Sequence, residues 1–404
     1  MNVLLVSSYL PYPLFSGGHI RLYNLIKELS AKHKITLVCE KRDHQGDVEI
    51  SEVKKFCKKV ITVPRKKQWS LKNILKTGLS TLPFLVIGHT SSEMYREIKR
   101  ELSENQFDLI HVETSYVMQN LPAGKAGIPV ILAEHNVEYL VYKRFADKAP
   151  LLLRLFLYID VLKLKYWEET MWQKATKLVA VSKIEKEIMS KIRKDTVIVS
   201  NGADITRFKV QSSKFKVDGG EKRILFIGEF KWMQNRDAIE WIIKEIWPRL
   251  MAEFIPSMTD KGIKLWVVGR TIPESIRRLT SDKNIIFDDN APKETEEIFK
   301  QANLLLAPIR VGGGTSFKIL EAMASGVPVI TTELGNAIGA KEEVEIVIAK
   351  NTEDFVVKIK KLVDDEKYYE IISKNARKLI EEKFNWTKIA EDLNSVYESV
   401  VPYA

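Results

Sequence analysis

Short apolar runs alternate along the chain with longer segments in which apolar residues recur every three or four positions. The short runs are typical of buried strands and the periodic segments of amphipathic helices. Their alternation predicts a parallel sheet covered by helices on both faces. In the first half we expect strands at residues 3–7, 35–39, 60–63, 109–112, 130–133, 178–181 and 197–199, mostly separated by helices such as residues 19–32 and 91–103.

The alternation is interrupted once, by a polar segment rich in serine and glycine at residues 211–222, which is typical of a linker. We therefore expect an N-terminal Rossmann-like domain over residues 1–208, a linker over 209–222, a second Rossmann-like domain over 223–385, and a C-terminal helix over 386–404 that packs back on one of them. The expected strands of the second domain are residues 224–227, 265–268, 285–287, 304–307, 327–331 and 346–348.

Composition narrows the class of protein. The chain has 63 Lys and Arg against 53 Asp and Glu, a net charge of +10. Residues 1–200 hold 32 of the Lys and Arg but 21 of the Asp and Glu. The excess of positive charge therefore lies in the first half of the chain and favours an anionic surface or substrate there. With two cysteines there is no disulfide framework or zinc cluster, and a reducing compartment is expected. We read the N-terminus as a strand rather than a signal peptide, and no apolar run reaches the roughly 20 residues of a spanning helix.

Ligands bind at the carboxyl ends of the strands in open parallel sheets, so functional motifs should follow strands. Ser16-Gly17-Gly18 follows the first strand and opens a helix, where paired glycines and free N–H groups suit an anion. Glu134-His135-Asn136 follows the strand at 130–133, and His135 there can donate to a sugar hydroxyl or a phosphate. An ordinary turn and a hydrogen-bonded strand-end histidine are the alternatives. Ser200-Asn201-Gly202-Ala203-Asp204, taken alone, favours a plain turn.

The most informative motif is the glycine-rich loop at residues 308–316, between the strand at 304–307 and a helix at 317–324. Its three glycines precede a helix start, which carries about half a positive charge, and Arg310 and Lys318 add full charges. This pattern predicts a diphosphate site, with Glu321 one turn further along suited to ribose hydroxyls. A glycine-rich connection with a surface lysine and glutamate is the alternative. The loop matches neither the Walker nor the dehydrogenase fingerprint.

These motifs resemble the retaining glycosyltransferases of the GT-B fold, in the large family named glycosyl transferases group one, or family four. Gly-Gly-Gly-Thr-x-x-Lys-x-x-Glu-Ala-Met-Ala-x-Gly-x-Pro-Val, at residues 312–329, is specific to a branch of it, as is Trp232 with Asn235-x-Asp237-Ala238. The resemblance covers nearly the whole chain and includes the three motifs of the first domain and Phe226-Ile227-Gly228, with Phe384-Asn385-Trp386 a weaker match.

The resemblance implies two Rossmann-like domains whose parallel sheets face a central cleft, with acceptor bound by the N-domain and donor by the C-domain. It implies that Glu321 binds the donor ribose and that His135 touches the donor sugar. We expect His135, Lys318 and Glu321 to carry the reaction. The residues expected to bind the donor are Gly17, Gly18, Asn201, Arg310, Gly312, Gly313, Gly314, Thr315, Ser316, Lys318 and Glu321.

Two departures from the family pattern concern charge. The family commonly has a glutamate where this chain has Gly313, and often an arginine and a lysine near the places of Glu229 and Gln234. Candidate substitutes for the two missing cations are Lys231, Arg236, Arg310 and Lys318. The phosphate contacts of this chain are therefore expected to differ from those of most of the family.

The expected function is transfer of a hexose-type sugar from a UDP- or GDP-linked donor to a glycan or lipid-linked acceptor, with retention and with neither metal nor other cofactor. Asp288-Asp289 adjoin after a strand, but a solvated loop explains them better than a metal site. Rival interpretations are a nucleotide-sugar 2-epimerase of similar fold and an inactive sugar-nucleotide-binding module. Nucleic acid is not expected, because the basic clusters lack an aromatic stacking array.

A membrane partner is also expected for the first domain. Residues 51–100 hold 12 Lys and Arg but 3 Asp and Glu. Within them, residues 64–85 combine lysines with apolar residues at helical spacing, and residues 151–167 do so again, as in helices that lie on anionic lipid. The alternative is that these apolar residues form the inner faces of ordinary helices. We expect a cytoplasmic protein, peripheral on the inner membrane face.

Overall fold

A computed structural model describes residues 1–123, 127–147, 149–208, 221–254, 262–292, 294–311 and 315–401. The chain forms two compact units: Met1–Ser200 together with Ile389–Ala404, which we call unit 1, and Asn201–Lys388, which we call unit 2. The division falls at Ser200, earlier than residue 208, where the sequence pattern ends the first domain. Residues 209–220 of the expected linker lie outside the described residues, and Lys222 already begins a strand.

Unit 1 contains a seven-stranded sheet in the order β3-β2-β1-β4-β5-β6-β7, and all neighbouring strands in it are parallel. Each strand coincides with one expected from the apolar runs. Their bounds are β1 (Asn2–Ser7), β2 (Lys34–Lys41), β3 (Lys59–Pro64), β4 (Leu109–Glu113), β5 (Val130–Glu134), β6 (Lys177–Ala180) and β7 (Val197–Ile198).

Helices connect these strands, as parallel pairing requires. Several begin at a serine whose hydroxyl accepts from the first turn, as Ser91 does from the Met94 N–H. The helices are α1 (Gly17–Leu29), α2 (Asp47–Lys54), α3 (Leu71–Leu79), α4 (Phe84–Gly88), α5 (Ser92–Glu104), α6 (Glu138–Asp147), α7 (Leu151–Lys174) and α8 (Lys183–Met189), with a 3-10 helix, η1, at Ser115–Asn120. Unit 1 also contains α16 (Trp386–Val400) from Ile389 onward.

Unit 2 contains a six-stranded sheet in the order β10-β9-β8-β11-β12-β13, again parallel throughout. Its strands are β8 (Lys222–Ile227), β9 (Ile263–Val268), β10 (Ile285–Asp288), β11 (Leu304–Ala307), β12 (Val329–Thr331) and β13 (Val347–Ile348). Its helices are α9 (Met233–Trp241), η2 (Ile242–Ile246, a π-helix), α10 (Trp247–Phe254), α11 (Glu274–Arg277), α12 (Thr295–Lys300), α13 (Phe317–Ala324), η3 (Glu333–Gly335, a 3-10 helix), α14 (Thr352–Asp364) and α15 (Glu366–Lys383).

Both faces of the unit 2 sheet are buried, which explains the continuous apolar runs in the sequence. Along β8, Ile224 and Phe226 belong to one apolar cluster and Leu225 to another, because successive side chains point to opposite faces. The expected α/β class with two parallel sheets is therefore confirmed.

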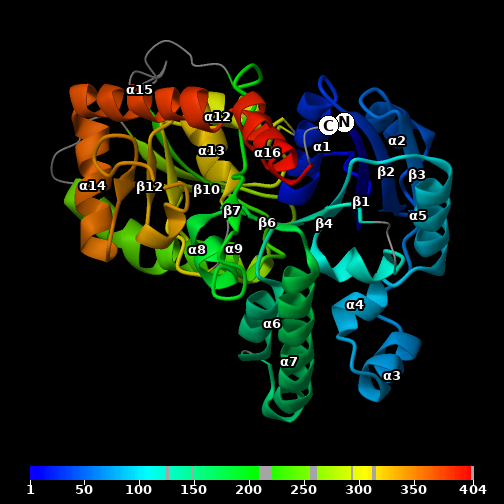
Figure 1. The fold of residues 1–404 in the computed structure, drawn as a ribbon. Helices are drawn as coiled ribbons and strands as arrows, with labels where there is room; N and C mark the ends of the chain where they lie inside the picture. The colour runs from blue at the N-terminus through cyan, green and yellow to red at the C-terminus, as the bar shows by residue number, and fades with distance from the viewer. Residues whose placement is uncertain are drawn as a thin grey trace. The chain divides into compact units, whose positions relative to one another are not determined.

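Two pairs of helices, α3 with α4 and α6 with α7, extend from unit 1 away from its sheet (Figure 1). α3 has no buried residue, and on the first turns of α7 the side chains of Leu152 and Phe156 are 86% and 69% exposed. The alternative of inner helix faces therefore holds for Phe84 and Leu85 on α4 and for Val161 and Leu164 on α7, which are buried, but not for α3 or the first turns of α7. Within the part of the chain that the structure describes, no helix is long and apolar enough to cross a membrane.

Candidate active site

The glycine-rich loop of unit 2 joins β11 to α13. Gly312, Gly313 and Gly314 lie outside the described residues, but both ends of the loop are defined. Ser316 is the N-cap residue of α13, and its side chain accepts no capping bond. Thr315 is buried and its hydroxyl has no hydrogen-bond partner among the described residues. Such a helix start retains donors for an anion. Asn201 lies beside it, its amide donating to the Thr315 carbonyl over 3.4 Å.

Lys318 lies in the first turn of α13, where we expected a diphosphate contact. Its ammonium donates to the side-chain oxygen of Asn235 over 2.8 Å and lies 5.1 Å from the ring centroid of Phe226. No carboxylate pairs with it among the described residues. Burial lowers the pKa of Lys318 to about 8. A partly buried cation without an acid is unfavourable alone and would be stabilised by a bound phosphate.

Asn235 holds Lys318 because Gly228 leaves room for it. A Cβ added at Gly228 would lie 2.7 Å from the Asn235 Cγ, so a side chain at position 228 would displace the amide. The amide nitrogen donates to the Glu229 carbonyl over 3.0 Å, which orients its oxygen toward Lys318. The sequence motif Asn235-x-Asp237 therefore orients cations of the glycine-rich segment.

Asp237 orients Arg310, as Asn235 orients Lys318. The guanidinium donates twice to this carboxylate, through Nε and Nη2 over 3.1 Å each, and lies 4.3 Å from the ring centroid of Trp241. The remaining amino group, Nη1, has no partner among the described residues. Arg310 is 43% exposed, so the pair itself contributes little to stability. It places Arg310 firmly, but one edge of the guanidinium is already neutralised.

Glu321 lies one turn beyond Lys318 on α13. Burial raises its pKa to about 7, against the opposing effects of the nearby Arg207 and of a hydrogen bond with Thr295. Arg207 forms an ion pair with Glu296, 2.6 Å away, so its positive charge is already partly neutralised and stabilises the Glu321 carboxylate less. Near neutral pH the carboxyl is thus both acceptor and donor, a combination that suits vicinal hydroxyls.

In unit 1, Gly18 and His135 come together although 117 positions separate them in the sequence. A Cβ at Gly18 would lie 3.3 Å from the His135 Nδ1 and 2.9 Å from the Tyr9 hydroxyl, so a larger residue here would displace one of these side chains. α1 begins at Gly17, and the Ser16 hydroxyl, which is bonded to His19 over 2.7 Å, does not cap it. The helix start with Gly17 and Gly18 and the imidazole of His135 therefore form one polar site.

The other ring nitrogen of His135, Nε2, is bonded to Glu113 at the end of β4. Burial of Glu113 would raise its pKa, but the facing His135 and His111 hold it well below its usual range. The carboxylate is thus ionised and orients the imidazole, leaving Nδ1 turned to Gly18. His111 is bonded in turn to the Tyr397 hydroxyl over 2.5 Å, so the C-terminal segment supports this chain of contacts.

The acid pair Asp288-Asp289 makes structural contacts. Asp288 accepts from the indole of Trp266 over 3.1 Å, and Asp289 forms an ion pair with Arg277. No group of three or more histidine, cysteine, aspartate or glutamate side chains that could hold a metal occurs in the described ranges.

Comparison with known proteins now bears on these sites. The family model Glycosyltransferase Family 4 matches residues 15–207, and the model Glycosyl transferases group 1 matches residues 221–365. The first covers strands β2 to β7 and the motifs of unit 1, and the second covers Lys318 and Glu321. The chain therefore belongs to the group 1, or family 4, glycosyltransferases.

Two curated relatives and one solved structure extend this finding. An uncharacterised 44.6 kDa protein in the cps region of Klebsiella pneumoniae is 24% identical over 96% of this chain and 97% of its own length. The Escherichia coli UDP-Gal:alpha-D-GlcNAc-diphosphoundecaprenol alpha-1,3-galactosyltransferase is 22% identical over 76% of this chain and 78% of its own length. The structure of Anabaena Alr3699/HepE in complex with UDP and glucose has a TM-score of 0.65 at 13% identity, with 99% of this chain and 100% of that chain covered, which shows a shared fold. The chain is a glycosyltransferase enzyme of the GT-B fold.

Some residues of these sites were missed by reasoning from sequence. Asn235 and Asp237 were noted as a family motif but not assigned to Lys318 and Arg310. Glu113 and Tyr9 were not considered. Their positions in the sequence could have indicated them, because Glu113 is the last residue of a buried strand and Tyr9 follows the end of another.

We predict that Lys318→Met and Glu321→Gln have different effects on ligand binding. Lys318→Met should lower the affinity for UDP at least tenfold and leave the affinity for uridine nearly unchanged, because it removes a contact to the diphosphate alone. Glu321→Gln should weaken both ligands by a similar factor, since both carry the ribose. Calorimetric titration measures this, with Lys350→Met as the control, and equal losses for both ligands in Lys318→Met would contradict the phosphate role.

The pKa of Lys318 gives a pH dependence with a defined sign. The ammonium is charged below a pKa of about 8. Affinity for UDP should therefore fall as the pH rises through 8, by about tenfold per unit while protonation of Lys318 limits binding. In Lys318→Met this fall should vanish. A fall of unchanged slope in the variant would assign it to another group.

His135→Ala should affect sugar transfer more than affinity for the donor. The change removes an imidazole oriented by Glu113, whereas the contacts of unit 2 to the nucleotide remain. We expect kcat to fall by at least tenfold with an unchanged Kd for UDP, and Glu113→Gln to lower kcat less. Normal turnover in His135→Ala would leave the residue only a structural role.

Proposed function

We propose that this enzyme transfers a hexose-type sugar from a UDP- or GDP-linked donor to a glycan or lipid-linked acceptor, with retention and without a metal. The observation that carries the proposal is Lys318, a partly buried cation held by the neutral Asn235 amide at the start of α13. The Escherichia coli relative is named for a UDP-sugar donor and a lipid-linked acceptor, and the Anabaena protein for a complex with UDP and glucose, which supports this choice.

The chemistry proposed for these residues is stabilisation of the leaving group. As the bond to the sugar breaks, negative charge accumulates on the diphosphate. Lys318, Arg310 and the N-terminus of α13 are placed to stabilise it, the contribution that preorganised charges make in a transition state. In retaining transfer the departing phosphate itself accepts the proton of the incoming hydroxyl, so no protein nucleophile is assigned.

A panel of UDP- and GDP-linked hexoses with a mixture of short glycan and prenyl-linked acceptors tests this function. We expect nucleoside diphosphate release with one donor, unchanged in a chelator, and a product whose anomeric configuration by NMR is that of the donor. Lys318→Met is the matched inactive control. Activity lost in the chelator and restored by manganese would contradict metal independence. An epimer formed from the donor without acceptor would favour the 2-epimerase instead.

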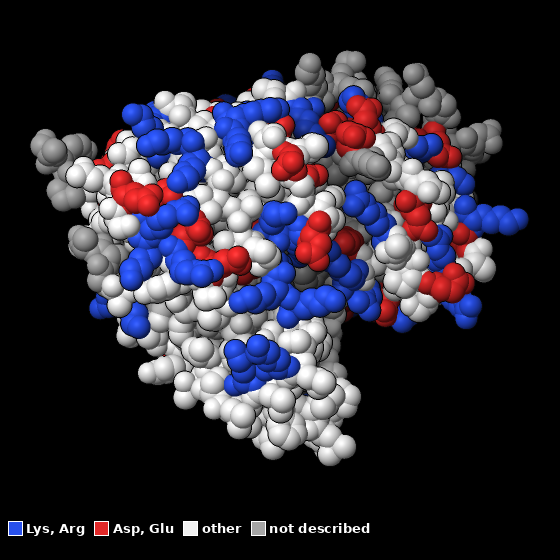
Figure 2. All heavy atoms as spheres, turned by 90° about the vertical axis from the view of Figure 1, so that its right-hand side faces the viewer, with Lys and Arg blue, Asp and Glu red and all other residues white. Residues whose placement is uncertain are grey.

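We also propose that unit 1 attaches to an anionic membrane surface through residues 64–85 and the first turns of α7. Trp69, Leu71 and Leu79 are 75%, 80% and 89% exposed. The lowest part of the molecule in Figure 2 shows Lys and Arg side chains among uncharged residues, with no acidic side chain visible there. Exposed apolar residues bordered by lysines match an interface of lipid chains and anionic headgroups in both hydrophobicity and charge.

Vesicle co-sedimentation tests the attachment. We expect binding to anionic vesicles and much weaker binding to neutral ones. Because each basic residue contributes about 1 kcal/mol near such a surface, Lys66→Glu with Lys67→Glu should lower binding at least about 30-fold. Lys191→Glu with Lys194→Glu, a charge reversal of equal size on exposed lysines of unit 1, is the control. Equal and negligible binding to both vesicle types would overturn the proposal.

A further inference from the structure

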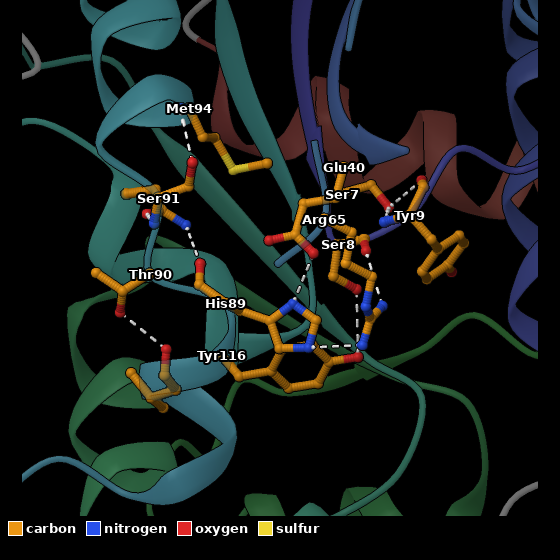
Figure 3. A network of polar contacts seen from close by, with 12 residues as sticks. Ser7, Ser8, Tyr9, Glu40, Arg65, His89, Thr90, Ser91, Met94 and Tyr116 are labelled. Carbon is orange, nitrogen blue, oxygen red and sulfur yellow. Dashed lines mark hydrogen bonds and ion pairs between the residues drawn. The ribbon is translucent and has the colours of Figure 1, made fainter. Parts of the chain in front are cut away.

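An arginine of unit 1 is held without an acidic partner. Arg65 follows β3, and its guanidinium donates to His89 Nε2 over 3.3 Å and to the Ser8 carbonyl over 3.4 Å. Figure 3 shows it between these two groups, with the ring of Tyr116 beside His89. No carboxylate lies within ion-pair distance of Arg65 among the described residues.

The histidine that holds Arg65 is itself held in one orientation. His89 is buried, and its Nδ1 lies 2.9 Å from a carboxylate oxygen of the buried Glu40. Since an arginine can only donate, the Nε2 facing Arg65 must carry the lone pair and Nδ1 the proton. Glu40 thus fixes the tautomer of His89, and a neutral imidazole positions the guanidinium. The arrangement places a full charge at the carboxyl end of the sheet and leaves it unneutralised by direct contact.

The surroundings of Arg65 are positive. Burial, followed by the charges of Arg42 and Arg65, lowers the pKa of His19 to about 4. Arg42, which follows β2, has an exposed side chain and forms no ion pair among the described residues. Arg65 and Arg42 are therefore two cations near the ends of β2 and β3 that have no ion-pair partner among the described residues, and the carboxylate of Glu40 faces His89 instead.

An apolar groove lined by lysines begins next to this region. Its volume is about 980 Å³, and its walls include residues 66, 67, 87, 88 and 90, which flank Arg65 and His89 in the sequence. Further along, Leu75, Leu79 and Leu82 line it together with Lys72 and Lys76. A groove with apolar side chains and lysines along its walls matches a molecule that has an anionic head and a hydrocarbon chain.

We propose that Arg65, positioned by His89 and Glu40, binds the phosphate group of a lipid-linked acceptor whose hydrocarbon chain occupies the groove along α3 and α4. This inference deepens the proposed glycosyltransferase function and rests on it, because it names the class of acceptor. The phosphate supplies the direct ionic partner that Arg65 and Arg42 lack among the described residues, and the hydrocarbon chain covers leucines that are otherwise exposed.

Calorimetric titration of the full chain, with its donor site saturated by UDP, tests the proposal with three probes: farnesyl diphosphate, farnesol and inorganic diphosphate. We expect farnesyl diphosphate to bind at least tenfold more tightly than either other probe. Arg65→Gln should lower its affinity at least tenfold and leave farnesol unchanged, while Arg65→Lys retains part of the affinity. Leu79→Ser should lower the affinity for farnesyl diphosphate but not the affinity for inorganic diphosphate.

Control variants separate binding from folding. Arg96→Gln, at an exposed arginine of α5, should bind all probes as the wild type does. His89→Leu should weaken both diphosphates and, because it leaves the buried Glu40 carboxylate without a partner, should also lower the melting temperature. His89→Gln, whose amide can accept from Arg65 and donate to Glu40, should retain binding of both diphosphates, with UDP affinity near that of the wild type.

Three results would overturn the inference: farnesyl diphosphate affinity unchanged in Arg65→Gln, inorganic diphosphate binding as tightly as the prenyl compound, or no prenyl binding once UDP is present. The last result would mean that the probe had occupied the donor site. Failure of UDP to bind the wild type would count against the proposed donor chemistry and leave the Arg65 result independent of it.

Discussion

The hydrogen bond between Lys318 and the neutral amide of Asn235 is the contact on which the interpretation of unit 2 depends. A carboxylate in the place of Asn235 would hold the lysine equally well but would cancel its charge before any ligand arrived. The amide orients the ammonium and leaves the charge intact. Arg65 is held by the imidazole of His89 in the same manner, so both units present a cation that is positioned by a neutral acceptor.

This arrangement has an energetic cost that the surrounding structure must support. A partly buried cation without a counter-ion destabilises the folded protein, and the lowered pKa of Lys318 reflects that burial. The remainder of the site is closely packed or held by hydrogen bonds. Gly228 packs against Asn235 without space for a side chain, and Asp237 fixes Arg310 by two hydrogen bonds. A ligand phosphate would relieve the cost, so binding and stability are coupled.

Much of the fold could be predicted because both sheets are parallel and buried, which produces continuous apolar runs such as residues 109–112 and 304–307. The glycine-rich segment was predictable for the same reason, since its position after a strand and before a helix is a local property. Contacts between distant residues were not. Lys318 and Asn235 are 83 positions apart, and Arg65 and His89 belong to different elements, so nothing local pairs them. The exposure of Leu152 was also unpredictable. Apolar residues at helical spacing predict an amphipathic helix, but they do not show whether another element packs against its apolar face.

The C-terminal segment makes unit 1 discontinuous in sequence. Residues from Ile389 onward belong with the first 200, and Tyr397 among them is buried against His111 and His33. During synthesis, the ribosome completes all of unit 2 before it makes the piece that finishes unit 1. The N-terminal part must therefore wait, with the site of Tyr397 open, until the last residues emerge. For the same reason, a fragment cut after residue 200 would lack part of its own core, and the unit that begins the chain is the last to be finished.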